Sequence, residues 1–478
     1  MNIQLNQVIN HILDQGTKIK VQRVSHNSIE ISSPGEIDFS ILLPENFQLE
    51  KEALEQLVNF AHFKTSSGRA MKCACATPDF HKGSSIPVGA VVVSDHDIVI
   101  PGAIGTDINC GMRLHHMGIG LDKFLEHKKE FLSLLKGDLL AGTRDIPTTD
   151  KAMQALFEDG LGAFWTQMQS ARNGIFSHID FNQVKQELNG LHASAFAKGN
   201  VNYAPEGLTN KAGVKNRQIM RDPSLATLAG GNHFCEVQVV KELVNRKKSY
   251  ELGLKVGDVV CMIHTGSRDV GFHVGNRWTD IAKAQYPKDL KYPHHKIFAI
   301  EGELAGEYLS AMHTAAHYAT ANRALIAECV RQRAYQSFGL KDNRLIVDVP
   351  HNICLKEDIG NVHRKGATPA YEGQLLIIPG SMGAESYLVA GLGSEKWLKS
   401  SSHGAGRSFS RNEISFKGKK NNALLGLEGV ECITLKEERK IEEAPGAYKQ
   451  IGPVIQSQSE EGTIDVVAVF SPLVTFKA

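Results

Sequence analysis

The sequence lacks the features that direct a chain into a membrane or out of the cell. Its 478 residues contain no apolar run that approaches the about 20 residues of a membrane span. The start, MNIQLNQVINHILDQGTK, has neither the basic beginning nor the unbroken apolar core of a signal peptide. Eight cysteines without such a signal indicate reduced thiols rather than a disulfide framework. We therefore expect a cytoplasmic protein with no membrane partner.

An excess of charge of either sign is also missing. The chain has 53 basic and 52 acidic side chains, so its net charge of +1 neither requires nor excludes nucleic acid. Two short basic clusters interrupt this balance, one from Arg246 to Lys248 and one from Lys417 to Lys420. Such clusters are compatible with solvated turns as well as with RNA contact.

Several catalytic motifs are absent. Without a G-x-x-x-x-G-K-[ST] loop, any nucleotide is bound otherwise than in P-loop proteins, and the K-x-D-G motif of lysine-adenylating ligases is missing too. His313 and His317 lack the acid of an H-E-x-x-H zinc motif, and we expect helix-surface or core histidines there. Cys73 and Cys75 are too close to form a comfortable disulfide loop. Five cysteines are expected to serve packing: Cys235, Cys261, Cys329, Cys354 and Cys432.

The patterns that are present alternate between strand and helix. Strands are expected within residues 19–33, 85–115, 234–240, 257–264, 344–349 and 374–380, and helices within residues 52–63, 121–200 and 303–338. Polar, glycine-containing stretches recur at 79–110, 230–268, 348–365 and 379–411. If these stretches form one site, no domain boundary separates them, and the chain is one large domain of the α/β or α+β class.

The stretch GTDINCGMR places two metal-ligand types in one turn. Asp107 and Cys110 can point at a common ion, and a thiolate can bridge two metals. Carboxylate favours Mn²⁺ or Mg²⁺, whereas thiolate and imidazole favour Zn²⁺, Co²⁺ or Fe²⁺. The alternative is that Asp107 caps the turn and Cys110 is a small buried apolar residue.

Three histidines are expected at strand ends beside glycine or asparagine. His233 lies in GGNHFCE, His264 ends the run VVCMIH, and His351 follows the run LIVDV. Strand ends are where α/β sheets build their sites, although each histidine alone is compatible with a structural role. The long gaps between them exclude a finger-type zinc site, whose ligands come in close pairs. The pattern predicts an open catalytic centre.

Two glycine-serine loops can hold a phosphate. In SSSHGAGR the backbone amides around His403 can form an anion-binding nest, and PGSMGAES at 379–386 is a second loop of this kind. A histidine beside such a nest can be a base, a metal ligand or a covalent nucleophile. A plain glycine-rich turn is the alternative.

In their order along the chain, these stretches resemble one family. GTDINCGMR, GGNHFCEVQ, IHTGSR, the His-Asn pair of PHNICLK, VHRKGAT, IPGSMG and HGAGR occur in this order in the RtcB-type RNA ligases, the GTP-dependent tRNA-splicing and RNA-repair ligases. The resemblance runs from about residue 70 to the C-terminus. The ordered set is highly specific, although single pieces are weak.

The resemblance implies an RtcB-like catalytic domain at residues 66–478, with mixed β-sheets and flanking helices around a central dinuclear metal site. Residues 1–65 would be a β/α extension without an assigned role. Two Mn²⁺ ions would be bound by five residues, with Cys110 bridging: Asp107, Cys110, His233, His264 and His351.

The resemblance also implies the reaction. His403 would attack the α-phosphorus of GTP, expel pyrophosphate and carry GMP to an RNA 3′-phosphate, which arises by opening a 2′,3′-cyclic phosphate. The 5′-hydroxyl of a second RNA end would then displace GMP. Fourteen positions match the nucleotide pocket: Asn232, Phe234, Glu236, Asn352, Pro379, Gly380, Ser381, Met382, Ser386, Gly404, Ala405, Gly406, Tyr448 and Lys477. Tyr448 would lie against guanine.

Three departures mark a divergent paralogue. The family's usual H-P-G-Y-G is here His81 to Ser85, Asp269 replaces a small residue, and Ile414 replaces an alanine. None of them removes a metal ligand or the nucleophile. The competing interpretation is a dinuclear metallophosphoesterase that opens cyclic phosphates without ligation, and a third is a binding protein without turnover. The identity of the RNA and the need for an activating protein stay open.

Overall fold

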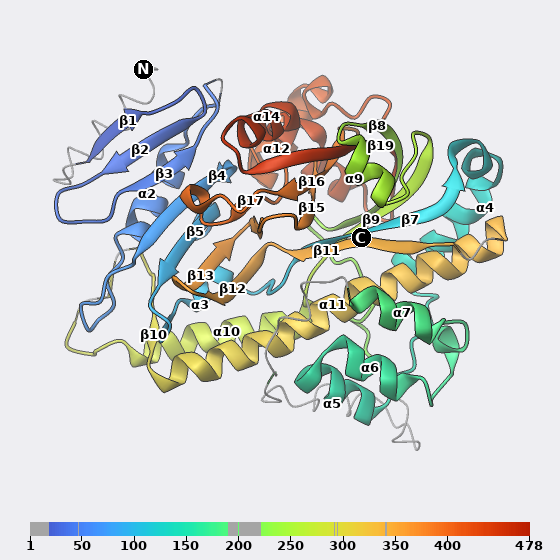
Figure 1. Ribbon diagram of the computed structural model, residues 1–478, viewed down its shortest axis with the longest axis horizontal. Helices are drawn as coiled ribbons and strands as arrows, with labels where there is room; N and C mark the ends of the chain where they lie inside the picture. The colour runs from blue at the N-terminus through green and yellow to red at the C-terminus, as the bar shows by residue number, and fades with distance from the viewer. Residues whose placement is uncertain are drawn as a thin grey trace.

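Two β-sheets form the framework of the described chain, and apolar runs of the sequence form their strands (Figure 1). The computed structural model describes residues 19–478 except residues 46, 190–198, 200–220, 291, 294 and 340–341. The run VVCMIH forms a strand that is buried throughout, because it lacks the polar alternation of a half-exposed strand. The predicted single large domain of mixed sheets with flanking helices is confirmed.

The larger sheet has the C-terminal strand near its centre. Within the described residues its order is β11 (Arg344–Pro350), β7 (Gly111–Gly120), β9 (Asp258–Thr265), β8 (Phe234–Leu243), β19 (Ile464–Lys477), β16 (Ser386–Gly391) and β15 (Leu375–Pro379), and β18 (Cys432–Thr434) pairs with β19. Each strand is antiparallel to the next strand in this sheet order. Among the described residues of this sheet, only the β18–β19 pairing is parallel. Strands far apart in the sequence therefore lie side by side in opposite directions. The loop after one strand lies beside the loop before its neighbour.

The second sheet joins the N-terminal strands to the strands that precede the site. Among the described residues its order is β1 (Lys20–Arg23), β2 (Ser28–Ser32), β3 (Phe39–Leu42), β4 (Cys73–His81), β5 (Val88–Ser94), β13 (Gly360–Lys365) and β12 (Asn352–Glu357). Two short pairs accompany the sheets: β6 (Ile98–Val99) with β10 (Ile300–Glu301), and β14 (Ala367–Pro369) with β17 (Ser400–Ser402).

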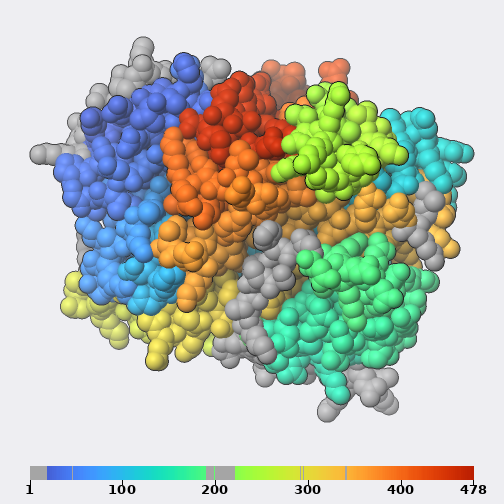
Figure 2. Space-filling model, viewed as in Figure 1, coloured from blue at the N-terminus to red at the C-terminus, as the bar shows by residue number. Residues whose placement is uncertain are grey.

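The N-terminal strands share a core with the rest of their sheet. Side chains of β2, β3 and α2 (Lys51–Ala61) form one apolar cluster with those of β4 and β5. Figure 2 shows the N-terminal segment against the C-terminal segment on one face, and the Asn27 amide donates to Glu460 at 2.6 Å. A domain boundary at residue 65 and the role of residues 1–65 stay predictions.

Helices cover the sheets, and the longest runs obliquely below the sheets in Figure 1, with further helices beneath its right-hand part. The remaining α-helices of the described residues are α3 (Pro101–Ile104), α4 (Leu121–Leu140), α5 (Asp150–Asp159), α6 (Leu161–Met168), α7 (Phe181–Leu188), α9 (Arg246–Glu251), α10 (Arg268–Gln285), α11 (Glu303–Phe338), α12 (Arg411–Lys420), α13 (Glu437–Glu442) and α14 (Ile451–Glu460). The middle of α11 is buried nearly all round, as expected for an alanine-rich helix inside a large core. It ends at Gly339, whose left-handed conformation suits glycine.

Two segments differ in detail from the elements expected from the sequence. Within the run DIVIPGAIG, the segment PGAI forms the helical turn α3 rather than a strand, because proline at the first helical position is preorganised for a helix. The helical pattern expected at 121–200 resolves into α4 to α7, and its last part lies outside the described residues. Within the described ranges, no helix combines the length and apolar character that crossing a membrane requires.

Candidate metal and nucleotide site

Four adjacent strands of the larger sheet bring the predicted metal ligands to one edge. Cys110 precedes β7, His264 lies near the end of β9, His233 precedes β8, and His351 follows β11. These strands are antiparallel neighbours in the order β11, β7, β9 and β8. The start of one strand therefore lies beside the end of the next, as in the pairing of Met112 and Phe234 with His264 on either side.

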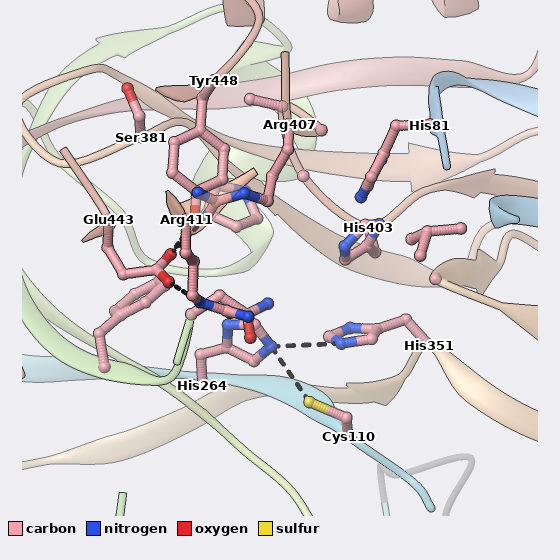
Figure 3. Close-up of a pocket in the computed structure, with 18 of the residues that line it drawn as sticks. His81, Cys110, His264, His351, Ser381, His403, Arg407, Arg411, Glu443 and Tyr448 are labelled. Atoms are coloured by element: carbon pink, nitrogen blue, oxygen red, sulfur yellow. Dashed lines mark hydrogen bonds and ion pairs between the residues drawn. The ribbon is translucent and has the colours of Figure 1, made fainter. Parts of the chain in front are cut away.

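The five side chains form two groups that share Cys110. Cys110, His264 and His351 make one group, and Asp107, Cys110 and His233 make the other, with ligand atoms within 4.8 Å of one another in each. The Sγ atom of Cys110 lies 3.2 Å from Nε2 of both His233 and His264. Nε2 of His264 lies 3.2 Å from Nε2 of His351, as the dashed lines of Figure 3 show, and Nε2 of His233 lies 2.8 Å from Oδ2 of Asp107.

This donor set fits two divalent cations. Ligand atoms about 2.0–2.3 Å from a common ion are separated by about 3.3–3.8 Å in tetrahedral geometry, so the observed separations of 2.8 and 3.2 Å need to widen by only a few tenths of an ångström to a little more than half an ångström. Burial, followed by the neighbouring rings, holds the pKa of His264 and His351 well below the ordinary value, so both imidazoles are neutral and able to bind metal. His233 donates from Nδ1 to the Leu228 carbonyl at 2.9 Å, which leaves Nε2 as its metal-binding atom.

The acidic members of the set also fit a cation. Burial and the Asp107 carboxylate raise the pKa of the Cys110 thiol well above its ordinary value. A thiolate at this position therefore needs a cation beside it, and metal binding releases the thiol proton. Burial opposes ionisation of Asp107, but His233 and Cys110 outweigh it and lower the pKa of this carboxyl group.

One arginine of α11 connects the segments that carry these ligands. Arg323 donates from Nη2 and Nε to Asp348 at 2.7 and 3.0 Å, and both side chains are buried. Its Nη1 donates to the carbonyl of Asn109 at 2.7 Å and to that of Thr265 at 3.0 Å. Asn109 and Thr265 directly adjoin ligands, so the guanidinium fixes the loop before β7 against the end of β9.

We predict that Arg323→Met lowers the free energy of unfolding by about 3–5 kcal/mol, because the buried Asp348 carboxylate loses its main partner. Urea unfolding followed by circular dichroism measures this change. Arg69→Met is the matched control, since Arg69 pairs with Asp97 at 2.7 Å on the surface. Its cost should stay below about 1 kcal/mol. Equal losses of unfolding free energy in the two variants would show that the buried Arg323–Asp348 pair stabilises the protein no more than a surface ion pair does.

His403 lies beside the metal cluster and is held by a carboxylate from β4. Its ring centroid is 4.8 Å from that of His351, and its Nδ1 lies 2.5 Å from Oδ2 of Asp79. The Thr77 hydroxyl donates to the other oxygen of Asp79 at 2.5 Å. Burial opposes ionisation of Asp79, yet the His403 ring and the Thr77 hydroxyl keep the pKa of this carboxyl below its ordinary value. Because the carboxylate engages Nδ1, Nε2 is the ring nitrogen with a free lone pair.

The loop that follows His403 packs tightly against the same aspartate. Gly406 has a φ of +75°, and a β-carbon there would lie 2.2 Å from the Asp79 carbonyl oxygen. The backbone N–H of His403 also donates to Oδ2 of Asp79 at 3.2 Å. Only glycine allows this approach, so the HGAGR stretch is shaped by its contact with β4 as well as by any phosphate.

A pocket of about 630 Å³ opens beside His403 and the metal cluster, a size that suits a nucleotide. Most positions predicted for nucleotide contact line it: Asn232, Phe234, Asn352, Pro379, Gly380, Ser381, Met382, Gly404, Ala405, Gly406, Tyr448 and Lys477. Glu236 and Ser386 are buried outside this lining. Both accept hydrogen bonds from the Gln238 amide, at 2.6 and 2.9 Å.

Comparison with known proteins decides the family. A profile described as "tRNA-splicing ligase RtcB" matches residues 56–478. The chain belongs to the RtcB family. The tRNA-splicing ligase RtcB of Thermococcus kodakarensis is 31% identical over 92% of this chain and 94% of its own length. That of Archaeoglobus fulgidus is 30% identical over 89% and 91%, and the RNA-splicing ligase RtcB homolog 2 of Entamoeba dispar is 31% identical over 84% and 80%.

The RtcB match covers the metal cluster, His403 and a charged group that the sequence did not reveal. Arg407 donates to Glu443 at 2.9 Å and Arg411 donates to its other oxygen at 2.7 Å (Figure 3). The Tyr448 hydroxyl donates to the same carboxylate, and the Arg407 guanidinium lies 4.9 Å from the Tyr448 ring centroid. All four line the pocket. Arg407 belongs to the HGAGR stretch and Glu443 lies five residues before Tyr448, but the sequence does not indicate that these residues pair.

Two further residues at the site, Asp79 and Lys365, were not indicated by the sequence. Asp79 lies in the buried strand β4, where an acid without an apparent partner was the available signal. Lys365, in the VHRKGAT stretch, lines the pocket and donates to the Ile104 carbonyl at 3.2 Å. Burial lowers the pKa of Lys365 to about 8 despite the nearby Asp107 and Cys110.

The remaining predicted residues lie away from the metal cluster or behind it. All eight cysteines are free, and Cys235, Cys261, Cys329 and Cys354 are buried. His313 and His317 lie on α11, where burial lowers the pKa of both, to about 4 for His313. Of the departures from the family pattern, Ile414 is buried in a small apolar cluster, and His81 lines the pocket with its pKa lowered by burial to about 4.

Proposed function

We propose that this chain is an RNA ligase that joins an RNA 3′-phosphate or 2′,3′-cyclic phosphate to an RNA 5′-hydroxyl, in RNA repair or tRNA splicing. GTP supplies the energy, and two Mn²⁺ ions are the metals. Family membership and the shared-cysteine donor set support this function. The substrate is RNA with 3′-phosphate or cyclic phosphate and 5′-hydroxyl ends.

Asp107, Cys110 and His233 would hold one ion, and Cys110, His264 and His351 would hold the other. When bound, the pair supplies positive charge that neutralises phosphate oxygens and lowers the pKa of an attacking hydroxyl. The choice of Mn²⁺ follows the family, because among these ligands only the Asp107 carboxylate favours Mn²⁺, whereas thiolate and imidazole favour Zn²⁺, Co²⁺ or Fe²⁺.

His403 is the proposed nucleophile. Asp79 accepts a hydrogen bond from the Nδ1–H group of the ring, so the Nε2 lone pair stays free. Nε2 attacks the α-phosphorus of GTP, a P–N bond forms, the P–O bond to the β-phosphate breaks and pyrophosphate leaves. Because Nδ1 keeps its proton while Nε2 gains the P–N bond, the ring becomes a cation, and the Asp79 carboxylate balances its positive charge.

Two transfers follow. The RNA 3′-phosphate, formed by opening the cyclic phosphate with water, attacks the phosphorus on His403 and takes GMP, which gives an RNA-(3′)pp(5′)G end and restores the ring. The 5′-hydroxyl of the second RNA then attacks the RNA-side phosphorus, and GMP leaves with the electron pair. Arg407 and Arg411 line the pocket and can bind phosphate oxygens through these steps.

The observation that carries the proposal is the Asp79–His403 pair beside the metal cluster, with the rings of His403 and His351 4.8 Å apart. A dinuclear phosphoesterase, the alternative, needs the cluster but no carboxylate-held nucleophile. The test is incubation with α-labelled GTP and Mn²⁺, followed by denaturation. Label on the protein supports the ligase, and metal-loaded protein without label contradicts it.

We predict that Lys477→Gln raises the GTP concentration for half-maximal labelling about 10-fold and weakens the preference for GTP over ATP. Lys477 lies in the pocket at the end of β19, with Glu443 and Glu236 as charged neighbours, and burial lowers its pKa to about 8. Loss of a hydrogen bond from a charged group to the base accounts for the expected size. Competition of labelled GTP with unlabelled ATP measures the preference. An unchanged preference would remove Lys477 from base selection.

We propose the cytoplasm as the compartment, and the eight free thiols support a reducing environment. The need for an activating protein is tested in the same labelling reaction. Robust labelling and ligation by the purified chain alone would show that no activator is required.

A further inference from the structure

Helix α12 begins at the pocket and leads away from it along the surface. Arg411 and Asn412, in its first turn, line the pocket, and its last residue is Lys420. A rise of 1.5 Å per residue places Lys420 about 12 Å along the axis from Asn412. Ser410 and Glu413 close a capping box at the start. The helix is thus a defined path between the active-site pocket and the solvent.

The inner face of α12 is fixed by packing. Ile414 is buried with Leu425, Ala444 and Ala447. Gly418, one turn further on, is also buried, and a β-carbon there would lie 2.5 Å from Leu425 Cδ2. Because the inner face is defined by residues 414 and 418, residues 412, 416, 419 and 420 point outward, whereas the half-buried Lys417 lies at the edge of the inner face.

The outward face combines an aromatic ring with ammonium groups. Phe416 is 60% exposed, although a phenylalanine on a polar helix gains nothing from water contact. Nζ of Lys420 lies 4.4 Å from the centroid of the Phe416 ring, and Nζ of Lys417 lies 3.4 Å from that of Phe409. From residue 412 to 427 the chain carries three lysines and one carboxylate, that of Glu413. Rings and cations therefore alternate along this face.

A fourth ammonium group lies at the pocket near the start of α12. Lys82, in the HKGSS departure from the family pattern, is exposed and lines the pocket. The Ser410 contacts, and then Lys417 and Lys82, hold the pKa of Glu413 below its ordinary value, so both lysines lie within electrostatic range of it. Lys82 thus adds to the positive charge near the start of α12.

We propose that the outward face of α12, formed by Phe416, Lys419 and Lys420, binds the single-stranded RNA segment whose end enters the pocket. This inference rests on the proposed ligase function. Phe416 offers a stacking surface that any base can use, and the lysines meet successive phosphates. Interleaved rings and cations match a polyanion with exposed bases better than a protein surface, which would need an apolar patch or carboxylates. Lys82 meets the phosphate nearest the pocket.

The test compares RNA of two lengths. Binding of a 3′-phosphorylated 12-mer and of a 3′-phosphorylated dinucleotide is measured by fluorescence anisotropy at several salt concentrations. Phe416→Ala and the double variant Lys419→Ala/Lys420→Ala should each weaken 12-mer binding about 10-fold, as expected for one lost base stack or two lost phosphate contacts. The double variant should also reduce the salt slope by about 1.4, since each single-strand phosphate contact contributes about 0.7. The dinucleotide is too short to reach both the pocket and Lys419.

The matched control is Arg246→Ala/Lys247→Ala in α9, which removes two exposed cations elsewhere. Equal loss of 12-mer binding in this control would overturn the proposal, because it would reveal only general attraction of RNA to positive charge. Unchanged 12-mer binding in the α12 variants would also overturn it and would favour a protein as the partner of this face.

Covalent labelling by α-labelled GTP on the same preparations separates this inference from the proposed function. A variant that still becomes labelled has an intact pocket, so a selective loss of long-RNA binding then supports the α12 surface. Labelling together with unaltered RNA binding leaves the ligase function in place and rejects the surface. If the parent protein takes no label, the proposed function fails, while the length and salt dependence still decide whether α12 binds RNA.

Discussion

Replacing Cys110 with alanine is expected to abolish nucleotidyl transfer and to remove both metal ions. Sγ of Cys110 lies 3.2 Å from Nε2 of His233 and 3.2 Å from Nε2 of His264, and it belongs to both ligand groups. The substitution therefore takes one of three donors from each ion at once. Loss of a supporting contact to a ligand already costs about 10–100-fold in metal affinity, so loss of a shared ligand should cost more. Metal analysis after gel filtration and labelling by α-labelled GTP measure the two effects.

Cys354→Ala is the matched control for this variant. Cys354 is a fully buried cysteine in β12 that belongs to neither ligand group. Both variants remove one sulfur atom from a packed interior, so their stabilities should be similar. Cys354→Ala should keep its metal and its labelling. A Cys110→Ala protein with normal metal content and activity would reduce Cys110 to a packing residue.

Replacing His403 with alanine is expected to abolish the covalent GMP adduct while both metal ions remain bound. His403 is a member of neither ligand group, and its Nδ1 is engaged by Asp79. The variant should still join RNA whose 3′-phosphate has been guanylylated beforehand, because that final attack does not use the histidine. Protein labelling, metal content and sealing of pre-activated RNA are measured on one preparation. The adduct of the parent protein should be acid-labile and alkali-stable, as expected for a P–N bond.

The same variant separates the two candidate functions. A phosphoesterase would lose no covalent adduct, since it forms none, and would keep opening cyclic phosphates. Label that persists in His403→Ala would place the nucleophile elsewhere. Label that disappears only together with the metal would show that His403 supports the cluster rather than attacking phosphorus. Absence of any adduct in the parent protein, with opening of cyclic phosphates intact, would favour the phosphoesterase.

Local sequence predicted the elements that carry the site better than it predicted the contacts between them. The expected helix at 303–338 coincides with α11, and the expected strand at 257–264 is β9 within one residue at each end. Both depend on contacts between residues near in sequence, namely helical periodicity and an unbroken apolar run. The segment PGAI was misassigned because a four-residue helix has too little periodicity to stand out from a turn.

The site required distant contacts that no local pattern encodes. Asp79 and His403 are separated by 324 positions in the chain, and Arg411 and Glu443 by 32. A short polar residue in an apolar strand has many potential partners, and only the sheet order selects one. Resemblance to a family supplied His403 as the nucleophile, but it gave no partner for its Nδ1.

The sequence by itself determined the ligand types, their positions at strand ends and the exclusion of a P-loop, because these follow from residue identity and short-range pattern. The tertiary structure decided that Cys110 lies between two groups of ligands, since this depends on the antiparallel order β11, β7, β9 and β8. It also decided which histidine nitrogens face the cluster, through contacts such as that of His233 with the Leu228 carbonyl. Strand pairing across hundreds of residues is fixed by the burial of the whole core, and no single segment contains that information.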